Sequence, residues 1–251
     1  MADETRTLVI VPTFCERDVI SLTLERIRFA SPGIHVLVVD DASPDGTADM
    51  VRARQAHDAS VFLLCRESKQ GLGPAYLDAF RWAAQRDYDV IVEMDADGSH
   101  DAGDLRRLIS GLDDADLVIG SRWVSGGATA GWSLPRRIIS RSGNMYARWI
   151  LGLDVRDATS GYRAFAALPL MSCLSDDMST QGYGFQVEMV WRFHRAGLRI
   201  AEVPIVFHER EAGASKMSVG IIAEAAVQIL LWRLFYRLQN RDRRKRASRR
   251  G

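Results

Sequence analysis

The sequence is poor in cysteine. Only 3 of its 251 residues are cysteines, at positions 15, 65 and 173. An odd and scattered set of this kind fits neither a disulfide framework nor the spacing of a metal-binding motif. We therefore expect an ordinary apolar core, with no covalent cross-links, in a reducing compartment.

The sequence also lacks a hydrophobic run long enough to cross a bilayer. The best candidate, residues 219–232, contains Glu224 and Gln228 and is shorter than the roughly 18 uncharged residues that a spanning helix needs. The N-terminal stretch MADETRT is acidic and has neither the basic nor the apolar region of a secretory signal. These absences predict a cytoplasmic protein without a transmembrane anchor.

Net charge is close to zero but unevenly distributed. From Arg233 onward there are nine Lys or Arg residues and one acid, Asp242, which gives +8 and leaves −7 for residues 1–232 of a chain whose total is +1. A basic end can bind an anionic membrane surface or a nucleic acid, or can simply remain a solvated, disordered tail. The charge distribution alone leaves these three alternatives open.

Short β-branched runs alternate with segments of helix length. This alternation predicts an α/β fold with a mostly parallel sheet whose strands are buried on both faces. The runs occupy residues 8–11, 36–39, 61–64, 90–94 and 116–120.

Acidic residues follow two of these runs directly. Asp40 and Asp41 follow one strand, and Asp95 and Asp97 follow another. Ligands of open α/β sheets bind beyond the carboxyl ends of the strands, so we interpret Asp41, Asp95 and Asp97 as candidate ligand-binding residues. For Asp40, a ligand contact and a solvated loop are equally good interpretations.

The neighbouring polar residues have local structural explanations. Pro44, Asp45 and Gly46 favour a turn, and Thr47 is a candidate N-cap. Asp101 and Asp104 are expected to begin the next helix, where acids interact favourably with the helix dipole.

Phosphate-binding glycine motifs are missing. The stretch GLGPAY at 71–76 has Tyr76 where a dinucleotide fingerprint needs its third glycine, and no Walker sequence occurs. A diphosphate ligand would therefore need a divalent cation, and acids such as Asp95 and Asp97 suit Mg²⁺ or Mn²⁺. A glycosidase carboxylate pair and a zinc site are weaker alternatives, since no His-rich ligand set accompanies the acids. We interpret His100 as a supporting or capping residue.

Several motifs occur together in a fixed order. They are VPTFCE, VVDDASPDGTA, MDADGSH, GSRW, TSGYRAF, GYGFQVE, VPIVF and HEREAGASK. From about Leu8 to Lys216 the chain thereby resembles dolichol- or polyprenol-phosphate mannose synthases, which are inverting glycosyltransferases of the GT-A type. The Gln-x-x-Arg-Trp motif of the processive polysaccharide synthases is absent.

The resemblance implies a fold and a domain organisation. The fold would be a GT-A nucleotide-sugar-binding fold, with a mostly parallel central sheet flanked by helices and a C-terminal amphipathic interface helix. The catalytic domain would span residues 1–216, the C-terminal membrane-interface helix 217–240 and the basic disordered tail 241–251.

The resemblance also implies roles for individual residues. A flexible loop around Gly213 would close over the donor. The catalytic residues would be Asp97, Arg122, Arg210 and Lys216, and a Mg²⁺ or Mn²⁺ ion would be held by Asp97, Ser99 and Asp95. Arg122 and Arg136 would hold the acceptor phosphate. The nucleotide-sugar pocket would contain Pro12, Phe14, Glu16, Val39, Asp41, Asp95, Ala96, Asp97, Arg210 and Lys216.

The activity implied is transfer of mannose from GDP-mannose to a polyprenyl monophosphate, with inversion, to give a polyprenyl-phosphate β-mannose. A phosphate monoester has its second pKa near about 6, so this acceptor arrives ionised and needs no catalytic base. The alternatives are a polyprenyl-phosphate glucose synthase that uses UDP-glucose and, in a different class, a nucleic-acid-binding protein that acts through its basic tail.

Residues 135–153 predict an amphipathic helix. Its apolar residues, which include Trp149, lie opposite Arg137, Arg141 and Arg148. The pattern alone fits an ordinary surface helix and an interfacial helix equally well, and the lipid acceptor favours the second. We expect peripheral contact with the cytoplasmic face of the membrane, with or without a membrane-anchoring partner protein, and no nucleic acid partner.

Overall fold

The fold is built on a mostly parallel sheet. The computed structural model describes residues 5–175, 178, 183–210 and 226–234. Within these residues, seven strands form one sheet in the order β3-β2-β1-β4-β7-β5-β8. The strands are β1 (Thr7–Thr13), β2 (His35–Asp40), β3 (Val61–Cys65), β4 (Val90–Glu93), β5 (Leu117–Ser121), β7 (Arg163–Ala166) and β8 (Ile200–Pro204). Two short strands, β6 (Ala128–Thr129) and β9 (Val206–Phe207), pair separately.

All five predicted strands are present, and the prediction of a mostly parallel sheet is confirmed. Among the described strands, β7 alone runs antiparallel to its neighbours, β4 and β5. Successive residues of β1 belong to different hydrophobic clusters: Leu8 and Ile10 to one, Val9 and Val11 to the other. Burial on both faces explains why these strands read as continuous apolar runs.

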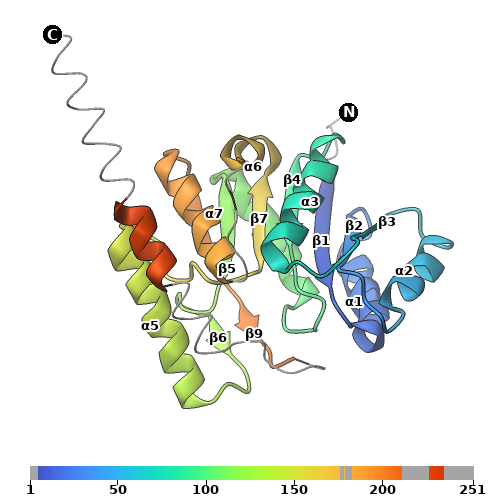
Figure 1. Ribbon diagram of the computed structural model, residues 1–251, viewed down its shortest axis with the longest axis horizontal. Helices are drawn as coiled ribbons and strands as arrows, with labels where there is room; N and C mark the ends of the chain where they lie inside the picture. Colours follow the sequence, from blue (N-terminus) through green and yellow to red (C-terminus); the bar gives the residue numbers. More distant parts are fainter. Residues whose placement is uncertain (1–4, 176–177, 179–182, 211–225, 235–251) are drawn as a thin grey trace, which may run out of the picture.

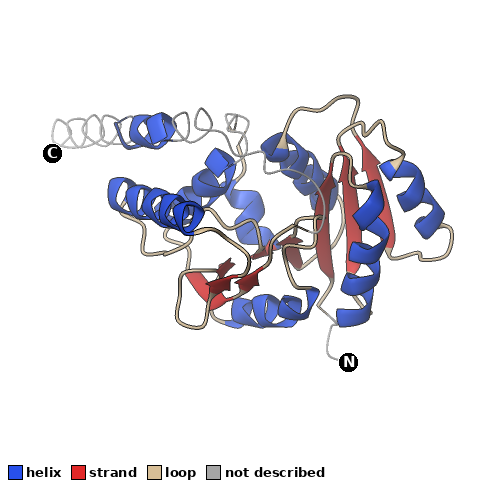
Figure 2. Ribbon diagram, turned by 90° about the horizontal axis from the view of Figure 1, so that it is seen from below, coloured by secondary structure: helices blue, strands red, loops and turns tan. Residues whose placement is uncertain are grey.

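Helices cover both faces of the sheet (Figures 1 and 2). The cluster on one face includes residues of α1 and α4, and that on the other includes residues of α3, α6 and α7. The helices are α1 (Arg17–Ala30), α2 (Thr47–Gln55), α3 (Leu72–Ala84), α4 (Leu105–Ser110), α5 (Leu134–Leu151), α6 (Ala167–Cys173) and α7 (Tyr183–Arg195), with 3₁₀ turns η1 (Ala102–Asp104) and η2 (Gly111–Asp113).

The prediction that Thr47 caps a helix was wrong by one residue. The N-cap of α2 is Gly46, whose φ of +87° a side chain would strain, and Thr47 is the first helical residue. The Thr47 hydroxyl donates to Asp45 Oδ1 at 2.6 Å and accepts from the Glu16 backbone N–H at 3.1 Å. Its partners therefore lie in the turn and in the loop after β1, so Thr47 joins the carboxyl ends of β1 and β2.

Two helices lie side by side at one end of the molecule. The predicted helix at 135–153 is present as α5, which Gly152 ends in a left-handed conformation. Residues 226–234 form a second helix, and the Tyr146 hydroxyl of α5 donates to its Ala226 carbonyl at 3.0 Å. The rest of the predicted helix 217–240 and the tail 241–251 lie outside the described residues. No described helix has both the length and the apolarity that crossing a bilayer requires.

A fully buried arginine joins the sheet to the loop before β7. Arg163 donates to the carbonyl oxygens of Ser160 (2.7 Å), Gln186 (2.8 Å) and Ala158 (2.7 Å). It pairs in register with Glu93, which is also fully buried. Burial lowers the pKa of Arg163 to about 10 and raises that of Glu93 to about 7, and each charge opposes the shift of the other.

Arg163→Met should destabilise the fold by about 3–5 kcal/mol, because it leaves three carbonyl groups and the buried Glu93 without their cation. Urea unfolding followed by circular dichroism measures this loss. The control is Arg106→Met, which replaces an exposed arginine of α4 and should change stability by no more than about 0.5 kcal/mol. Equal stability of the two variants would contradict the role assigned to Arg163.

Candidate active site

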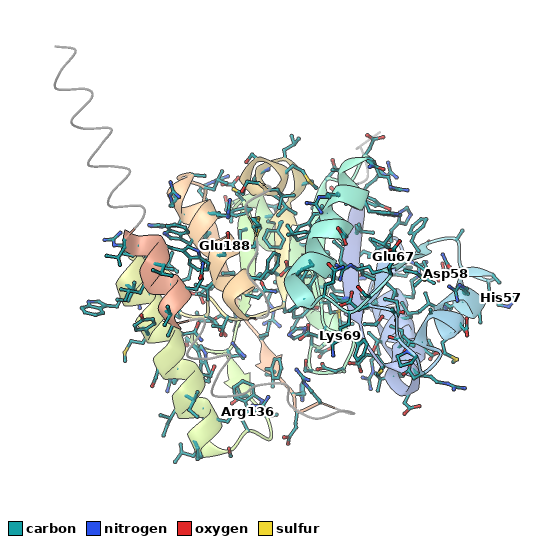
Figure 3. All side chains as sticks on the ribbon, viewed as in Figure 1. His57, Asp58, Glu67, Lys69, Arg136 and Glu188 are labelled. Carbon is teal, nitrogen blue, oxygen red and sulfur yellow. The ribbon has the colours of Figure 1, made fainter. Side chains whose placement is uncertain are left out.

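The candidate site lies at the carboxyl ends of β1, β2, β4 and β5. The loops that leave these strands contain most of the predicted site residues, at the lower edge of the sheet in Figure 1. Figure 3 labels two basic residues at this edge, Lys69 after β3 and Arg136 near the start of α5.

The loop after β4 brings two carboxylates and an arginine together. Asp97 is 5% exposed, and its Oδ1 accepts from the Ser99 backbone N–H at 3.1 Å. Arg210 Nε lies 2.7 Å from Asp97 Oδ2, an ion pair whose N–H is not aligned as a hydrogen bond. Burial and the charge of Asp97 raise the pKa of Asp95 to about 7, while Arg210 opposes the rise. Additional positive charge beside Asp95 would favour its ionised form.

The acidic loop fits a divalent cation that arrives with a phosphate ligand. Among the described residues, no three His, Cys, Asp or Glu side chains are grouped as a complete metal site. Two carboxylates suit Mg²⁺ or Mn²⁺ when phosphates and water supply the remaining ligands. The Ser99 hydroxyl is fully buried beside Asp97 and has no hydrogen-bond partner, so it is a further oxygen for such a site.

His100 supports this loop from inside. Its Nδ1 accepts from the Asp95 backbone N–H at 3.1 Å, and its ring stacks on Tyr162 at 4.7 Å between centroids. Burial lowers the pKa of His100 to about 4, with contributions from Arg122 and Arg210 that the charges of Asp97 and Asp157 oppose. The ring is therefore neutral at physiological pH.

The two acids after β2 hold loops in place. Asp40 accepts from the Thr13 hydroxyl at 3.0 Å and the Ser43 backbone N–H at 2.9 Å. Its carboxylate is thus occupied within the protein. Of the two interpretations of Asp40 that the sequence left open, these contacts favour the structural one.

Asp41 fixes the loop that follows β3. Its carboxylate is paired with Arg66 and accepts the backbone N–H groups of Gln70 and Gly71, each at 3.2 Å. Lys69 of this loop lies over the Phe14 ring, with Nζ 3.7 Å from the centroid. By holding this loop, Asp41 helps to place the Lys69 ammonium over the Phe14 ring.

The other predicted pocket residues lie nearby. Pro12 is at the end of β1 and Glu16 immediately precedes α1. Val39 is fully buried in β2, and the Ala96 carbonyl accepts from Thr23 Oγ1 at 2.7 Å. The roles of these residues in binding a nucleotide sugar stay predictions, as do those of Asp41, Asp95 and Asp97.

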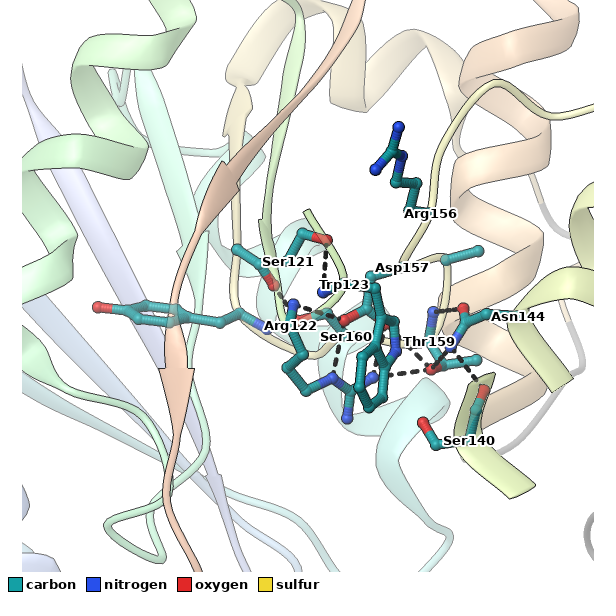
Figure 4. Close-up of polar contacts among 12 residues, drawn as sticks. Ser121, Arg122, Trp123, Ser140, Asn144, Arg156, Asp157, Thr159 and Ser160 are labelled. Carbon is teal, nitrogen blue, oxygen red and sulfur yellow. Dashed lines mark hydrogen bonds and ion pairs between the residues drawn. The ribbon is translucent and has the colours of Figure 1, made fainter. Parts of the chain in front are cut away.

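Arg122 is held by a buried carboxylate that sequence reasoning missed. Its Nε and one terminal nitrogen donate to the two oxygens of Asp157 at 2.7 and 2.6 Å, and the same terminal nitrogen donates to Thr159 Oγ1 at 2.9 Å (Figure 4). Asp157 is fully buried. The one sequence signal was its position two residues before the TSGYRAF motif.

Aromatic rings surround the arginines on this side. The Arg122 guanidinium carbon lies 5.4 Å from the Trp132 ring centroid, and that of Arg136 lies 4.1 Å from the same centroid. Arg141 lies 5.2 Å from the Trp123 ring. The two indole N–H groups and Arg136 Nε are buried without hydrogen-bond partners. Unsatisfied donors beside cations suit an anionic ligand.

Two predicted features cannot be placed. Lys216 and the proposed mobile loop around Gly213 lie outside the described residues, and Arg210 is the last described residue before them. Their roles stay predictions.

Buried carboxylates and arginines thus lie together at the carboxyl edge of a mostly parallel α/β sheet, which is where such sheets bind their ligands. Residues 8–168 match the family model for glycosyl transferase family 2. The chain belongs to this family and is a glycosyltransferase, and the GT-A-type fold expected from the sequence is confirmed.

Two named relatives match most of the chain. An undecaprenyl-phosphate mannosyltransferase from Micrococcus luteus is 52% identical over 91% of this chain and 94% of its own length. A polyprenol monophosphomannose synthase from Mycolicibacterium smegmatis is 44% identical over 93% of this chain and 89% of its own length.

Solved structures share the fold at low identity. A glucosyl-3-phosphoglycerate synthase from Mycobacterium tuberculosis, in complex with Mn²⁺, UDP and its product, superimposes with a TM-score of 0.63 at 21% identity, covering 93% of this chain and 80% of that one. A mannosyltransferase from Pyrobaculum calidifontis, in complex with GDP-mannose and Mn²⁺, gives 0.59 at 20%, covering 93% and 64%.

The buried neutral state of His100 predicts a pH-dependent stability. Its folded-state pKa of about 4 lies below the ordinary value of 6.5, so the unfolded chain binds the proton first as the pH falls. Stability from this residue is therefore lost between about pH 6.5 and pH 4. In His100→Asn, the free energy of unfolding should fall less steeply across this window, by up to about 1.4 kcal/mol per pH unit. An unchanged slope would contradict the assignment.

Proposed function

We propose that this glycosyltransferase transfers mannose from GDP-mannose to a polyprenyl monophosphate with inversion. The observation that carries the proposal is the arrangement of the site, which has a two-carboxylate loop on one side and Arg122 and Arg136 on the other. Beside these arginines, Arg136 Nε and the indole N–H groups of Trp123 and Trp132 are buried without hydrogen-bond partners. This suits two phosphate-containing substrates. The names of the two relatives, at 52% and 44% identity, support mannose and a polyprenyl phosphate.

On the donor side, Asp97, Asp95 and Ser99 would hold Mg²⁺ or Mn²⁺, which neutralises charge on the departing diphosphate. Manganese in two solved structures of this fold supports a divalent cation. Arg210 now pairs with Asp97 and would turn to the diphosphate, joined by Lys216. Phe14 and Lys69 would contact the base.

On the acceptor side, the ionised phosphate is the nucleophile. One of its oxygens forms a bond to the anomeric carbon from the face opposite the diphosphate, as the bond to the diphosphate oxygen breaks. Arg122 and Arg136 would hold the acceptor phosphate in this position, so that orientation and charge stabilisation supply the catalysis. No proton has to be removed, and the site needs no general base.

Asp97→Asn should lower mannose transfer by at least about 100-fold, because it removes one charge from the cation-binding pair. The assay uses labelled GDP-mannose, Mn²⁺ and a polyprenyl phosphate. Asp101→Asn is the matched control: Asp101 is exposed, caps the 3₁₀ turn η1 through a 2.8 Å contact with the Gly103 N–H, and should leave transfer within about threefold. Full activity of Asp97→Asn would refute the metal assignment, and transfer from UDP-glucose alone would refute the donor.

We further propose that α5 and the helix at 226–234 contact the membrane surface. Large apolar side chains of α5 are exposed: Leu134 (67%), Ile138 (55%), Ile139 (46%), Met145 (69%) and Trp149 (81%). Val227, Leu230, Leu231 and Leu234 of the neighbouring helix are exposed too. Exposed arginines of α5 and the basic segment 241–251 would add attraction to anionic lipids. This localisation, the domain boundaries at 216 and 240 and a membrane-anchoring partner protein stay predictions.

Trp149→Ala should weaken binding to anionic vesicles by about tenfold, as expected for an indole that no longer enters the interface. Co-sedimentation with phosphatidylglycerol-containing vesicles measures the partition. Phe29→Ala is the matched control, since Phe29 is an equally isolated aromatic residue, 91% exposed, on α1 at the other end of the sheet. If both variants bind as the wild type does, α5 is not the membrane surface; if both bind less, the contact is not specific to α5.

A further inference from the structure

The inner side of α5 carries a buried polar residue. Asn144 is 3% exposed, on the same buried side of the helix as Ala147 and Leu151. Its Nδ2 donates to the Ser140 carbonyl and to Thr159 Oγ1, both at 3.0 Å, and its Oδ1 accepts from the Thr159 backbone N–H at 3.2 Å (Figure 4). The amide is thus directed at one residue of the loop before β7.

The Thr159 hydroxyl makes all the hydrogen bonds that it can make. It accepts from Asn144 Nδ2 at 3.0 Å and from an Arg122 terminal nitrogen at 2.9 Å, and it donates to Asp157 Oδ1 at 3.3 Å. A hydroxyl has two lone pairs and one proton, so all three of its positions are occupied. In the series of hydrogen bonds that connects Asn144 through Thr159 to Arg122, donor and acceptor are therefore fixed at each step.

Packing alone does not require an asparagine at this place. An apolar residue would fill the inner face of α5 without the cost of burying an amide, which is offset only when the amide is hydrogen-bonded. Met145, the next residue, is 69% exposed on the surface that we propose meets lipid. Two adjacent residues of α5 therefore point to different surroundings. The Met145 thioether lies on the proposed lipid-facing side, and the Asn144 amide lies in the Arg122 network.

We propose that Asn144 is a positioning residue, which acts through Thr159 to fix Arg122 relative to the membrane-facing helix. The inference rests on the proposed function. The phosphate of a lipid acceptor lies at a distance from the membrane surface that the bilayer sets. The arginine that binds it must therefore lie at a fixed distance from α5, the helix proposed to contact that surface. The chain Asn144–Thr159–Arg122 supplies that match for a phosphate monoester held in a membrane.

Asn144→Ala should lower kcat/KM for a polyprenyl phosphate in vesicles by roughly 10- to 100-fold, mainly through a higher acceptor KM, since a hydrogen bond in a charged network is lost. The KM for the mannose donor, measured in the same assay, should change less than twofold, and vesicle binding should be unchanged. Ser142→Ala, on the exposed side of the same turn, is the matched control and should behave as the wild type does.

A second pair of variants covers the case in which Asn144→Ala does not fold. Thr159→Val keeps the shape but removes the hydroxyl and should reproduce the acceptor defect, whereas Thr159→Ser keeps the hydroxyl and should restore activity to within about threefold. In an Arg122→Lys background, Asn144→Ala should lower the acceptor kcat/KM by less than about threefold. A residue that acts only through Arg122 has little further effect once Arg122 has been replaced.

Three results would overturn the inference while the proposed function stands: an unchanged acceptor KM in Asn144→Ala and Thr159→Val, equal losses for donor and acceptor, or a full additional loss in the Arg122→Lys background. Absence of mannose transfer by the wild type to any polyprenyl phosphate would instead overturn the proposed function, and this inference with it.

Discussion

The buried ion pair between Arg122 and Asp157 is the contact on which the proposed acceptor half of the site depends. Burying two charges is costly, and the pair is retained only because further hydrogen bonds surround it. The Asp157 backbone N–H donates to Glu202 of β8 at 2.9 Å, and the Arg122 backbone N–H donates to Asp157 at 2.9 Å. Through Asp157 and through Thr159, the Arg122 guanidinium at the end of β5 is thereby connected to β8 and to α5.

The acidic loop follows the opposite principle. The charge of Asp97 helps to raise the pKa of the buried Asp95, and the one cation paired with these acids among the described contacts is Arg210, at the edge of the described chain. Arg122 is fixed by buried partners, whereas Asp97 is paired with Arg210, which we propose that a metal ion and a diphosphate replace. Arg122 thus has fixed partners, whereas the partner of Asp97 can change. A changeable partner suits a donor that binds intact and whose diphosphate leaves after the sugar has been transferred.

The sequence predicted the buried strands and the acids that follow them. It did not predict the residues whose role depends on contacts between segments far apart in the chain. The five apolar runs indicate strands that are buried on both faces, and the acids that follow two of them lie where parallel strands end. Strand β7 was missed because it has only four residues and begins with a charged one, Arg163, so that it does not read as an apolar run. Asp157 and Asn144 were missed because an isolated acid or amide in a loop or helix becomes informative only when its buried partner is known.

An ionised phosphate acceptor would explain why the proposed acceptor side is built from arginine, tryptophan and a buried network rather than from a catalytic base. The nucleophile needs no activation, so catalysis depends on how accurately the phosphate is oriented. For a soluble acceptor, that orientation can come from the site alone. For an acceptor held in a bilayer, the membrane fixes one end of the substrate, and the enzyme must fix its arginine against the same plane. A hydrogen-bonded link from the exposed helix α5 to Arg122 meets this requirement within the fold itself.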